Sequence, residues 1–376
     1  MEEKMNFLVM SVRAGYGHHS TGKALVEYFE SMGHKCEMLD IFDYISPTLA
    51  NSIQDGYLLS TKYFSKPYGK LYEKMAQNDE PYKKVSITAL LSNEISKRLT
   101  QYVYEFEPSA IIATHSFAAV VMTILKKKEV FSCPTIGIVT DFTVHPFWES
   151  TNLDYYVVAD KLLTWQAQKK GIAKEKVLPT GIPIRRQFST KLDKQEARRQ
   201  LGLKDKRTIL IMMGSMGYGD VGSSLSELDD FDTDFQLLCV CGSNAKLKAS
   251  LESKSFRKDV VIYGFVDNVD VLMDASDIIF SKPGGLTTSE AFAKQLPMIT
   301  ANPLPGQEDR NTDFLLNCGA ILEVNDRFSL SEALNNLFNS SWRLDQMRES
   351  VRHLGKPNAT KDLCEFVVKE CEKKNN

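Results

Sequence analysis

The chain has 376 residues, of which 43% are hydrophobic and 25% are charged, and its formal net charge is -2. A chain of this length is too long to fold around a single hydrophobic core, so we expect two domains of ordinary size. The composition is that of a soluble globular protein without an apolar run long enough to cross a bilayer, and the near-neutral charge argues against general binding of nucleic acid. Any contact with a membrane is therefore expected to be peripheral.

The N-terminal segment predicts a strand, a glycine loop and a helix. An apolar run from Asn6 to Ser11 precedes the loop, and helical spacing follows from Gly22 to Met32. Ligands of open parallel sheets bind at the carboxyl ends of the strands, where this loop lies. Gly15 and Gly17 lack the third glycine of the dinucleotide fingerprint, which argues against a nicotinamide cofactor. The loop reads Arg13-Ala14-Gly15-Tyr16-Gly17-His18-His19-Ser20, and a second strand is expected from Lys35 to Ile41.

Residues 45 to about 96 interrupt the α/β pattern with interleaved tyrosines and lysines. Aromatic rings favour the boundary between water and lipid, and lysines favour anionic headgroups, so this insert suits attachment to an anionic membrane surface. The alternative is that the aromatic rings pack into the N-terminal domain while the lysines stay solvated. The residues expected at the membrane are Tyr63, Phe64, Lys66, Tyr68 and Lys70.

The α/β pattern then returns, and polar residues follow the strands. A strand at 109–114 ends at His115-Ser116-Phe117, and a strand at 135–140 ends in a segment from Asp141 to Trp148 that contains His145. Both strand ends deliver polar side chains to the ligand-binding edge of a parallel sheet. A strand at 155–159, a helix at 162–170 and a strand at 177–180 lead to a linker expected near residues 181 to 190.

The second half repeats this architecture without repeating the sequence. A strand at 208–213 is followed by a loop that begins Gly214-Ser215, whose backbone N–H groups suit a phosphate. A strand at 260–263 ends in Gly264-Phe265-Val266, whose main-chain groups could read a uracil edge or could form a plain turn.

The run from Ser281 to Asn311 holds the most chemical information. A strand at 277–280 breaks at Pro283-Gly284-Gly285, and a helix is expected from Thr287 or Thr288 to Lys294. A glycine pair before a helix N-terminus favours an anion, here a diphosphate, and Glu290 is placed to bind a ribose diol. The alternative is a tight turn followed by a capping box made by Thr287 and Glu290. Gln307 and Glu308 then offer an amide and a carboxylate suited to sugar hydroxyls.

These motifs together resemble the monogalactosyldiacylglycerol synthase and processive diacylglycerol glucosyltransferase family. The matching segments are Gly15-Tyr16-Gly17-His18, Thr140-Asp141-Phe142, Thr180-Gly181-Ile182-Pro183-Ile184, KPGG-x-T-x-x-E from Lys282, and PGQE from Pro305. The resemblance implies an inverting GT-B glycosyltransferase that uses a UDP-sugar and needs no metal or other cofactor. It also implies two Rossmann-like domains facing each other across a cleft, with domains at 1–185 and 186–345 and C-terminal helices at 346–376 that cross back to the first domain.

The resemblance also implies residue roles. His18 is the first candidate for the catalytic base, Asp141 could assist it, and His145 is the rival base. The expected donor is UDP-glucose or UDP-galactose, the expected acceptor is diacylglycerol near Gly17 and Trp148, and the expected location is the cytoplasmic face of the cell membrane. A UDP-sugar epimerase and a non-catalytic nucleotide-sugar-binding regulator are the alternatives. The donor-binding residues are expected to be Gly214, Ser215, Gly264, Phe265, Val266, Pro283, Gly284, Gly285, Thr287, Glu290, Gln307 and Glu308.

Overall fold

A computed structural model describes residues 4–12, 16–45, 93–213, 221–301, 303 and 306–375. The chain forms two compact units. The first comprises Met1–Arg186, Leu304–Gln307 and Asn358–Asn376, and the second comprises Gln187–Pro303 and Glu308–Pro357. The chain thus passes from one unit to the other within the segment expected as a linker. The residues expected at the membrane (Tyr63, Phe64, Lys66, Tyr68 and Lys70) and two expected phosphate ligands (Gly214 and Ser215) lie outside the described residues.

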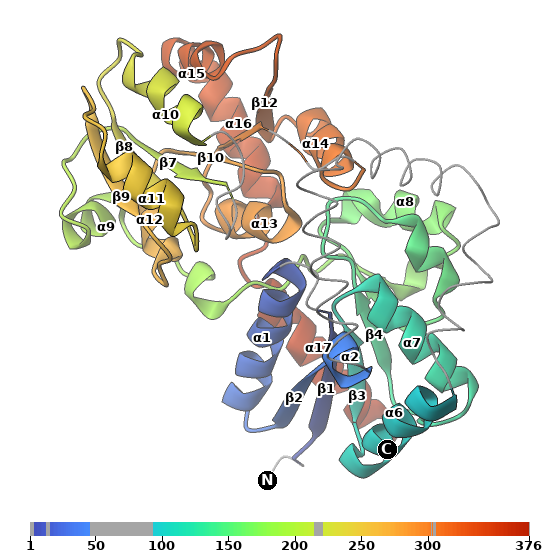
Figure 1. Ribbon diagram of the computed structural model, residues 1–376. Helices are drawn as coiled ribbons and strands as arrows, with labels where there is room; N and C mark the ends of the chain where they lie inside the picture. The colour runs from blue at the N-terminus through green and yellow to red at the C-terminus, as the bar shows by residue number, and fades with distance from the viewer. Residues whose placement is uncertain are drawn as a thin grey trace. The chain divides into compact units, whose positions relative to one another are not determined.

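The first unit is built on a parallel sheet in the order β2-β1-β3-β4-β5-β6 (Figure 1). Strands β1, β3 and β4 are buried on both faces and therefore read as short, almost continuous apolar runs, whereas the edge strand β2 is partly exposed and carries charged residues. Phe7 of the first strand stacks on Phe29 of the first helix with ring centroids 4.0 Å apart. The strands are β1 (Asn6–Ser11), β2 (Lys35–Asp40), β3 (Ala110–Ala113), β4 (Thr135–Ile138), β5 (Tyr155–Val157) and β6 (Val177–Leu178).

The helices of the first unit lie between its successive strands, except for α17, which ends the chain. The first of them starts at Tyr16, earlier than the expected Gly22, so His18 lies in its first turn rather than in a loop. Gly22 therefore lies inside the helix, where close packing requires a glycine, because a Cβ there would come within 2.5 Å of the Met38 sulfur on the neighbouring strand. The helical segments are α1 (Tyr16–Ser31), α2 (Ile41–Ile45), α6 (Asn93–Phe106), α7 (Ser116–Lys127), η1 (Pro146–Ser150), η2 (Lys161–Leu163), α8 (Thr164–Lys169), η3 (Lys174–Lys176) and α17 (Ala359–Asn375).

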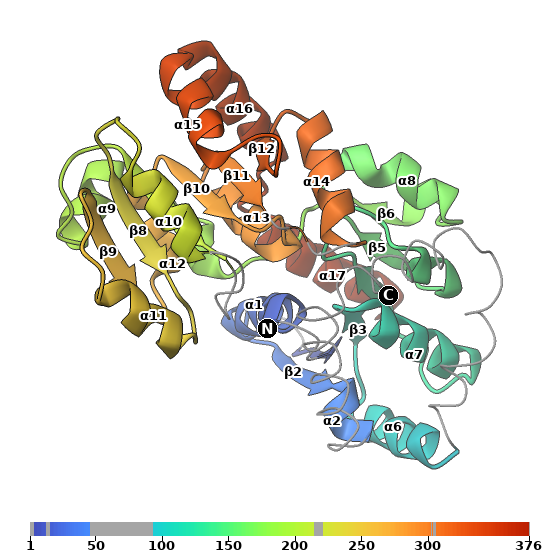
Figure 2. The same cartoon turned by 45° about the horizontal axis from the view of Figure 1, so that its top comes forward.

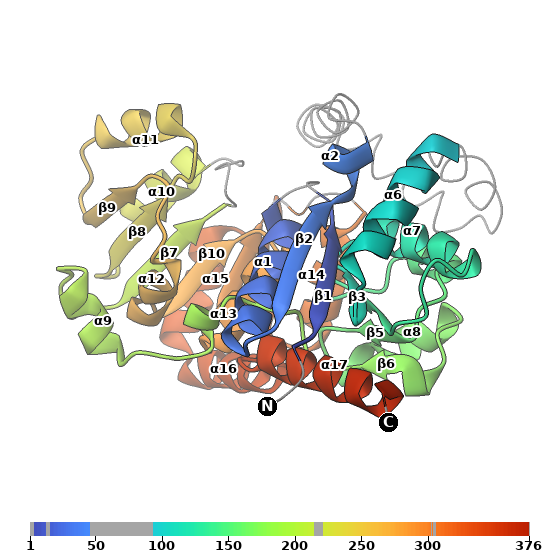
Figure 3. The ribbon, with the colours of Figure 1, turned by 90° about the horizontal axis from the view of Figure 1, so that it is seen from below.

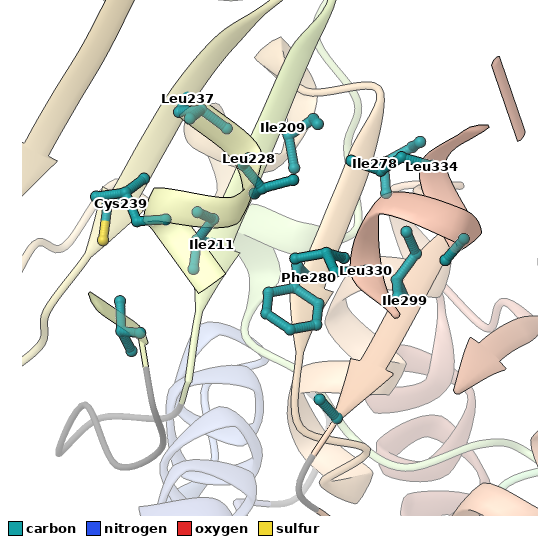
Figure 4. Close-up of a cluster of buried hydrophobic side chains, with 14 of the residues drawn as sticks. Ile209, Ile211, Leu228, Leu237, Cys239, Ile278, Phe280, Ile299, Leu330 and Leu334 are labelled. Atoms are coloured by element: carbon teal, nitrogen blue, oxygen red, sulfur yellow. The ribbon is translucent and has the colours of Figure 1, made fainter. Parts of the chain in front are cut away.

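The second unit has a parallel sheet in the order β12-β11-β10-β7-β8-β9, with part of it seen face-on in Figure 2. Apolar side chains from the central strands and from the covering helices form its core, which Figure 4 shows around Ile211, Phe280 and Leu330. The strands are β7 (Thr208–Met212), β8 (Gln236–Val240), β9 (Asp259–Tyr263), β10 (Ile278–Ser281), β11 (Met298–Ala301) and β12 (Ile321–Val324). The helical segments are η4 (Arg186–Phe188), α9 (Lys194–Gln200), α10 (Val221–Asp229), α11 (Ala245–Glu252), α12 (Val269–Ala275), α13 (Gly285–Ala293), α14 (Glu308–Asn317), α15 (Leu330–Asn339) and α16 (Ser341–Leu354).

The C-terminal segment joins the first unit later than expected. Met347 of α16 is part of the core of the second unit, and only residues from Asn358 onward belong to the first. Helix α17 then buries Leu363 and Val367 beside the first sheet (Figure 3). The Thr360 hydroxyl donates to the Ile184 carbonyl at 2.6 Å and accepts the Ile184 N–H at 3.0 Å. The segment expected from residue 346 therefore begins at 358.

A buried ion pair ties α13 to α12 inside the second unit. Lys294 Nζ lies 2.7 Å from Asp274 Oδ2, and the two side chains are only 1% and 0% exposed. The ammonium also donates to the Thr190 carbonyl, and Asp274 accepts the Leu192 N–H at 3.2 Å. Burial raises the pKa of Asp274 in spite of the lysine beside it. The pair is therefore a point at which removal of one partner leaves the other charge in an apolar interior.

We expect Lys294→Ala to lower the free energy of unfolding by about 3–5 kcal/mol, because breaking a buried pair strands its partner. Urea denaturation followed by circular dichroism measures the change. The matched control is Lys248→Ala, which removes an exposed i,i+4 pair with Glu252 and should cost about 0.5 kcal/mol or less. Equal effects of the two substitutions would contradict the expected role of the buried pair.

Candidate active site

His18 has a fixed orientation at the carboxyl ends of the first sheet. Its Nδ1 lies 2.8 Å from the Thr114 carbonyl oxygen and 2.9 Å from the Thr140 hydroxyl oxygen. A carbonyl oxygen can only accept a hydrogen bond, so Nδ1 carries the proton of the neutral ring. The unprotonated nitrogen is consequently Nε2, and this is the atom at which His18 can accept a proton.

The surroundings of His18 favour its neutral form. Burial lowers the pKa of its imidazole below the usual value of 6.5, while the negative charge of Asp141 and the bond to the Thr114 carbonyl oppose that shift. The ring is therefore expected to be neutral near pH 7, with one proton on Nδ1. A neutral imidazole with a free lone pair is what general-base catalysis requires.

His115 is a neighbour of His18 that no sequence motif singled out. The two rings meet edge to face, with centroids 4.6 Å apart and an interplanar angle of 78°. His115 caps α7, since its Nδ1 accepts the Phe117 N–H at 3.0 Å. Burial, followed by the nearby His18 and His145, lowers the pKa of His115 well below 6.5. A neutral His115 places no second positive charge beside His18. Its position directly after a buried strand was the only signal in the sequence.

His145 differs from His18 in the role of its Nδ1, which accepts a hydrogen bond instead of donating one. It is buried and caps η1, where its Nδ1 accepts the Phe147 N–H at 3.1 Å. In the neutral ring the proton is then on Nε2, and the lone pair of Nδ1 is engaged by the backbone. This arrangement suits a structural role and leaves His18 as the better placed base.

The remaining predicted site residues of the first unit are Asp141, Gln307, Gly17 and Trp148. The Gln307 side-chain amide donates to the Asp141 carboxylate, so a residue expected to bind the donor contacts one expected to assist catalysis. Gly17 lies beside His18 in the first turn of α1. Trp148 is only 4% exposed and packs near Gly137 and Tyr156. Its contact with an acceptor stays a prediction.

The glycine turn of the second unit opens directly into a helix. Helix α13 begins at Gly285 with Gly284 as its N-cap and without a side-chain cap. Thr287 therefore lies inside the first turn, and the alternative of a capping box made by Thr287 and Glu290 is wrong. The first N–H groups of an α-helix have no acceptor within the helix and favour an anion. The start of α13 thus retains the features of a phosphate site.

Two residues of α14 and one of α13 lie around this turn. A Cβ built on Gly284 would lie 3.7 Å from Glu308 Oε1, which places that carboxylate beside the glycine pair. Asn311 is fully buried, and its Nδ2 donates to the Pro283 carbonyl at 3.0 Å. No sequence motif pointed to this clamp on the turn. Glu290 is 7% exposed on the following helical turn.

Gly264, Phe265 and Val266 follow β9, the strand at one edge of the second sheet. The Phe265 side chain is 67% exposed, which is unusual for a phenylalanine. An exposed ring at a strand end is compatible with contact to a flat base, and the role of this turn stays a prediction.

Comparisons with known proteins assign both units to families. Residues 18–184 match the family described as monogalactosyldiacylglycerol (MGDG) synthase, and residues 193–354 match glycosyl transferases group 1. A processive diacylglycerol beta-glucosyltransferase from Bacillus licheniformis is 29% identical over 99% of this chain and 97% of its own length.

The chain joins a monogalactosyldiacylglycerol synthase domain to a group 1 glycosyl transferase domain.

The resemblance stated from the sequence motifs is thereby confirmed. Solved structures share the fold: MurG of Acinetobacter baumannii has a TM-score of 0.60 at 15% identity and covers 98% of this chain, with all of its own chain matched. The calicheamicin glycosyltransferase CalG4 has a TM-score of 0.65 at 12% identity, with 99% of both chains covered. The expected GT-B fold with two Rossmann-like domains is confirmed.

The fold by itself is shared with another class of enzyme. A putative UDP-N-acetylglucosamine 2-epimerase from Listeria monocytogenes has a TM-score of 0.59 at 12% identity and covers 99% of this chain and 98% of its own. Fold similarity therefore does not separate glycosyl transfer from epimerisation, and the family matches and the site carry that distinction.

Metal-binding groups and membrane-spanning helices can be sought in the part of the chain that the structure describes. Within these described residues, we find no group of three or more His, Cys, Asp or Glu side chains placed to hold a metal ion. No helix among them has both the length and the apolar character needed to span a bilayer. Metal independence stays a prediction.

Proposed function

We propose that this protein is an inverting glycosyltransferase that moves a hexose from a UDP-sugar to diacylglycerol or to a glycosyl-diacylglycerol. The observation that carries the proposal is the 2.8 Å contact of His18 Nδ1 with the Thr114 carbonyl oxygen, which makes Nε2 the proton-accepting atom, in the domain that matches monogalactosyldiacylglycerol synthase. The full-length relatives are named as diacylglycerol beta-glucosyltransferases, so UDP-glucose is the favoured donor and UDP-galactose the second.

In the proposed reaction, His18 acts on the acceptor and the N-terminus of α13 acts on the donor. His18 Nε2 takes the proton of the acceptor hydroxyl, and that oxygen attacks the anomeric carbon of the sugar. The bond from the anomeric carbon to the phosphate oxygen breaks, and UDP leaves with the electron pair. The N-terminus of α13 and the Gly284-Gly285 pair stabilise the negative charge of the departing diphosphate.

The rest of the donor is assigned to side chains beside that turn. Glu290 accepts hydrogen bonds from the ribose diol, and Glu308 contacts the hexose beside the glycine pair. Phe265 and the adjacent main chain face the uracil. No divalent metal is required for departure of UDP in this proposal, and an assay containing EDTA tests that point.

The acceptor is a lipid, so the proposed site of action is the cytoplasmic face of the cell membrane, with the protein attached peripherally. The basic, aromatic insert at residues 45–96 supports this location by its composition.

One assay separates the proposed function from its rivals. Purified protein is incubated with labelled UDP-glucose or UDP-galactose and with diacylglycerol dispersed in detergent. A labelled glycolipid is the expected product. Isomerised UDP-sugar without glycolipid would instead indicate an epimerase, and tight binding of UDP-sugar without any product would indicate a regulator.

The pH dependence of the reaction reports on His18. Its lowered pKa places the acid limb of the kcat/KM profile below pH 6.5, since the base is lost only when the ring becomes protonated. Asp141 raises the pKa of His18, so Asp141→Asn should move the acid limb to still lower pH. An exposed carboxylate on the same unit, Glu175, serves as control through Glu175→Gln, which should leave the limb in place. An upward shift in Asp141→Asn would contradict the assignment.

A further inference from the structure

A second surface of the first unit has the composition of a membrane contact, although it lies far in sequence from the insert. Leu162 is 57% exposed and Trp165 is 66% exposed. Large apolar side chains are normally buried, and an exposed tryptophan beside an exposed leucine marks a surface that contacts something apolar. We call Lys161, Leu162, Trp165 and Lys169 the α8 patch.

Helical geometry places these side chains together. Residues 161–169 form η2 and α8 without a break. Leu162, Trp165 and Lys169 are spaced by three and four residues, which puts them on one face, and Lys161 lies four residues before Trp165. The Lys169 ammonium lies 5.8 Å from the centroid of the Trp165 ring. The opposite face is held by buried Leu163 and Ala167. The exposed face therefore results from the packing of the helix rather than from a frayed end.

The charge around the patch favours one kind of partner. Residues 161–176 contain five lysines and one glutamate, whereas the whole chain has a net charge of -2. One of these lysines, Lys170, pairs with Glu149 at 2.7 Å, so the positive charge at the patch comes from Lys161 and Lys169. Lysines beside an exposed tryptophan and leucine are complementary to a surface with negative headgroups over an apolar interior. An anionic lipid bilayer has both properties.

The position of α8 in the fold connects this surface to the site. Helix α8 joins β5 to β6 at one edge of the first sheet and lies on the outside of that unit (Figure 1). On its inner side the side-chain carbonyl oxygen of Gln166 accepts the Val144 N–H, and it lies 3.4 Å from the Thr143 hydroxyl. Val144 lies between Asp141 and Trp148, in the segment that carries His145. Gln166, the residue after Trp165, thus connects the helix of the patch to the loop from Asp141 to Trp148.

We propose that the α8 patch docks the protein on the anionic surface of a lipid bilayer, with Leu162 and Trp165 entering the interface and the lysines contacting headgroups. This inference rests on the proposed function, in which the acceptor is a membrane lipid. It adds a contact surface with named residues and places the loop from Asp141 to Trp148 next to the membrane.

Vesicle sedimentation tests the proposal with the full chain. The vesicles are phosphatidylcholine alone or phosphatidylcholine mixed with phosphatidylglycerol. The double variant Leu162→Ser/Trp165→Ser should weaken binding to the mixed vesicles by about tenfold or more, since two apolar side chains leave the interface. The variant Lys161→Gln/Lys169→Gln should weaken binding to the mixed vesicles, as high salt should, and should leave the weaker binding to neutral vesicles unchanged.

Matched controls come from the second unit. Trp342 has the same 66% exposure as Trp165, and Trp342→Ser should bind like the unmodified protein. Lys246→Gln/Lys254→Gln removes two exposed lysines outside the patch and should have little effect. Wild-type binding by Leu162→Ser/Trp165→Ser would overturn the proposal. So would a shift from dimer to monomer in the patch variants with vesicle binding unchanged, because the patch would then join two copies of the chain.

An assay in detergent separates this proposal from the proposed function. With diacylglycerol dispersed in detergent, the patch variants should make glycolipid at the wild-type rate, since their substitutions touch only the membrane contact. Glycolipid synthesis in detergent together with undiminished vesicle binding by the variants would reject the patch and keep the function. No product from the unmodified protein in detergent would reject the function, while vesicle sedimentation would still decide whether the patch binds lipid.

Discussion

His18→Ala is expected to lower turnover by a factor of about 100 to 10,000 while UDP binding stays intact, because loss of a general base typically has this effect. The substitution removes Nε2, the nitrogen that the Thr114 carbonyl leaves unprotonated. Steady-state rates with UDP-glucose and diacylglycerol measure turnover, and calorimetric titration with UDP measures binding. His18→Asn provides a second variant, since its amide can still donate to Thr114 but has no basic nitrogen.

Variants of two other histidines serve as controls for this test. His353 is exposed and pairs with Glu349, so His353→Ala should turn over at the wild-type rate. His145→Ala should reduce turnover less than His18→Ala, because the ring of His145 engages the backbone of η1. Normal turnover in both His18 variants would move the base to His145 or Asp141.

Glu290→Gln should raise the dissociation constant for UDP-glucose by a factor of about 10 to 100. The carboxylate is expected to accept both hydrogen bonds of the ribose diol, and hydrogen bonds to a charged group contribute about 1.5–3 kcal/mol. The amide of glutamine retains the shape of the side chain, so the loss reports on charge rather than on a cavity. Calorimetric titration with UDP and UDP-glucose measures the change.

The neighbouring residue provides the control for Glu290. The Ser289 hydroxyl donates to the Gly285 carbonyl at 2.8 Å within α13, and Ser289→Ala should leave the donor affinity unchanged. Vesicle binding should be unchanged in both variants, since neither touches the α8 patch. An unaltered affinity of Glu290→Gln for UDP-glucose would contradict the ribose role.

The strands were predictable because each corresponds to a short apolar run in the sequence. Runs such as Asn6–Ser11 and Thr208–Met212 are apolar on both faces, and that pattern is typical of strands in a parallel sheet covered by helices. The helix starts were less predictable, because glycine is a poor helix former. Both α1 and α13 begin earlier than their glycines suggested. At Gly22 the close contact with Met38 leaves no room for a side chain, so tertiary packing outweighs the low helix propensity of glycine.

Periodicity and short motifs were enough to predict the two α/β domains, the glycine turn before α13 and the candidates for base and donor ligands. The protonated nitrogen of each histidine, in contrast, follows from tertiary contacts. The partners of His18 lie 96 and 122 residues away along the chain, and the amide that meets Asp141 lies 166 residues away. The same holds for the α8 patch, whose exposure depends on which face of a short helix the sheet edge buries. Contacts of this range depend on how the strands are ordered in space, and no local pattern encodes that order.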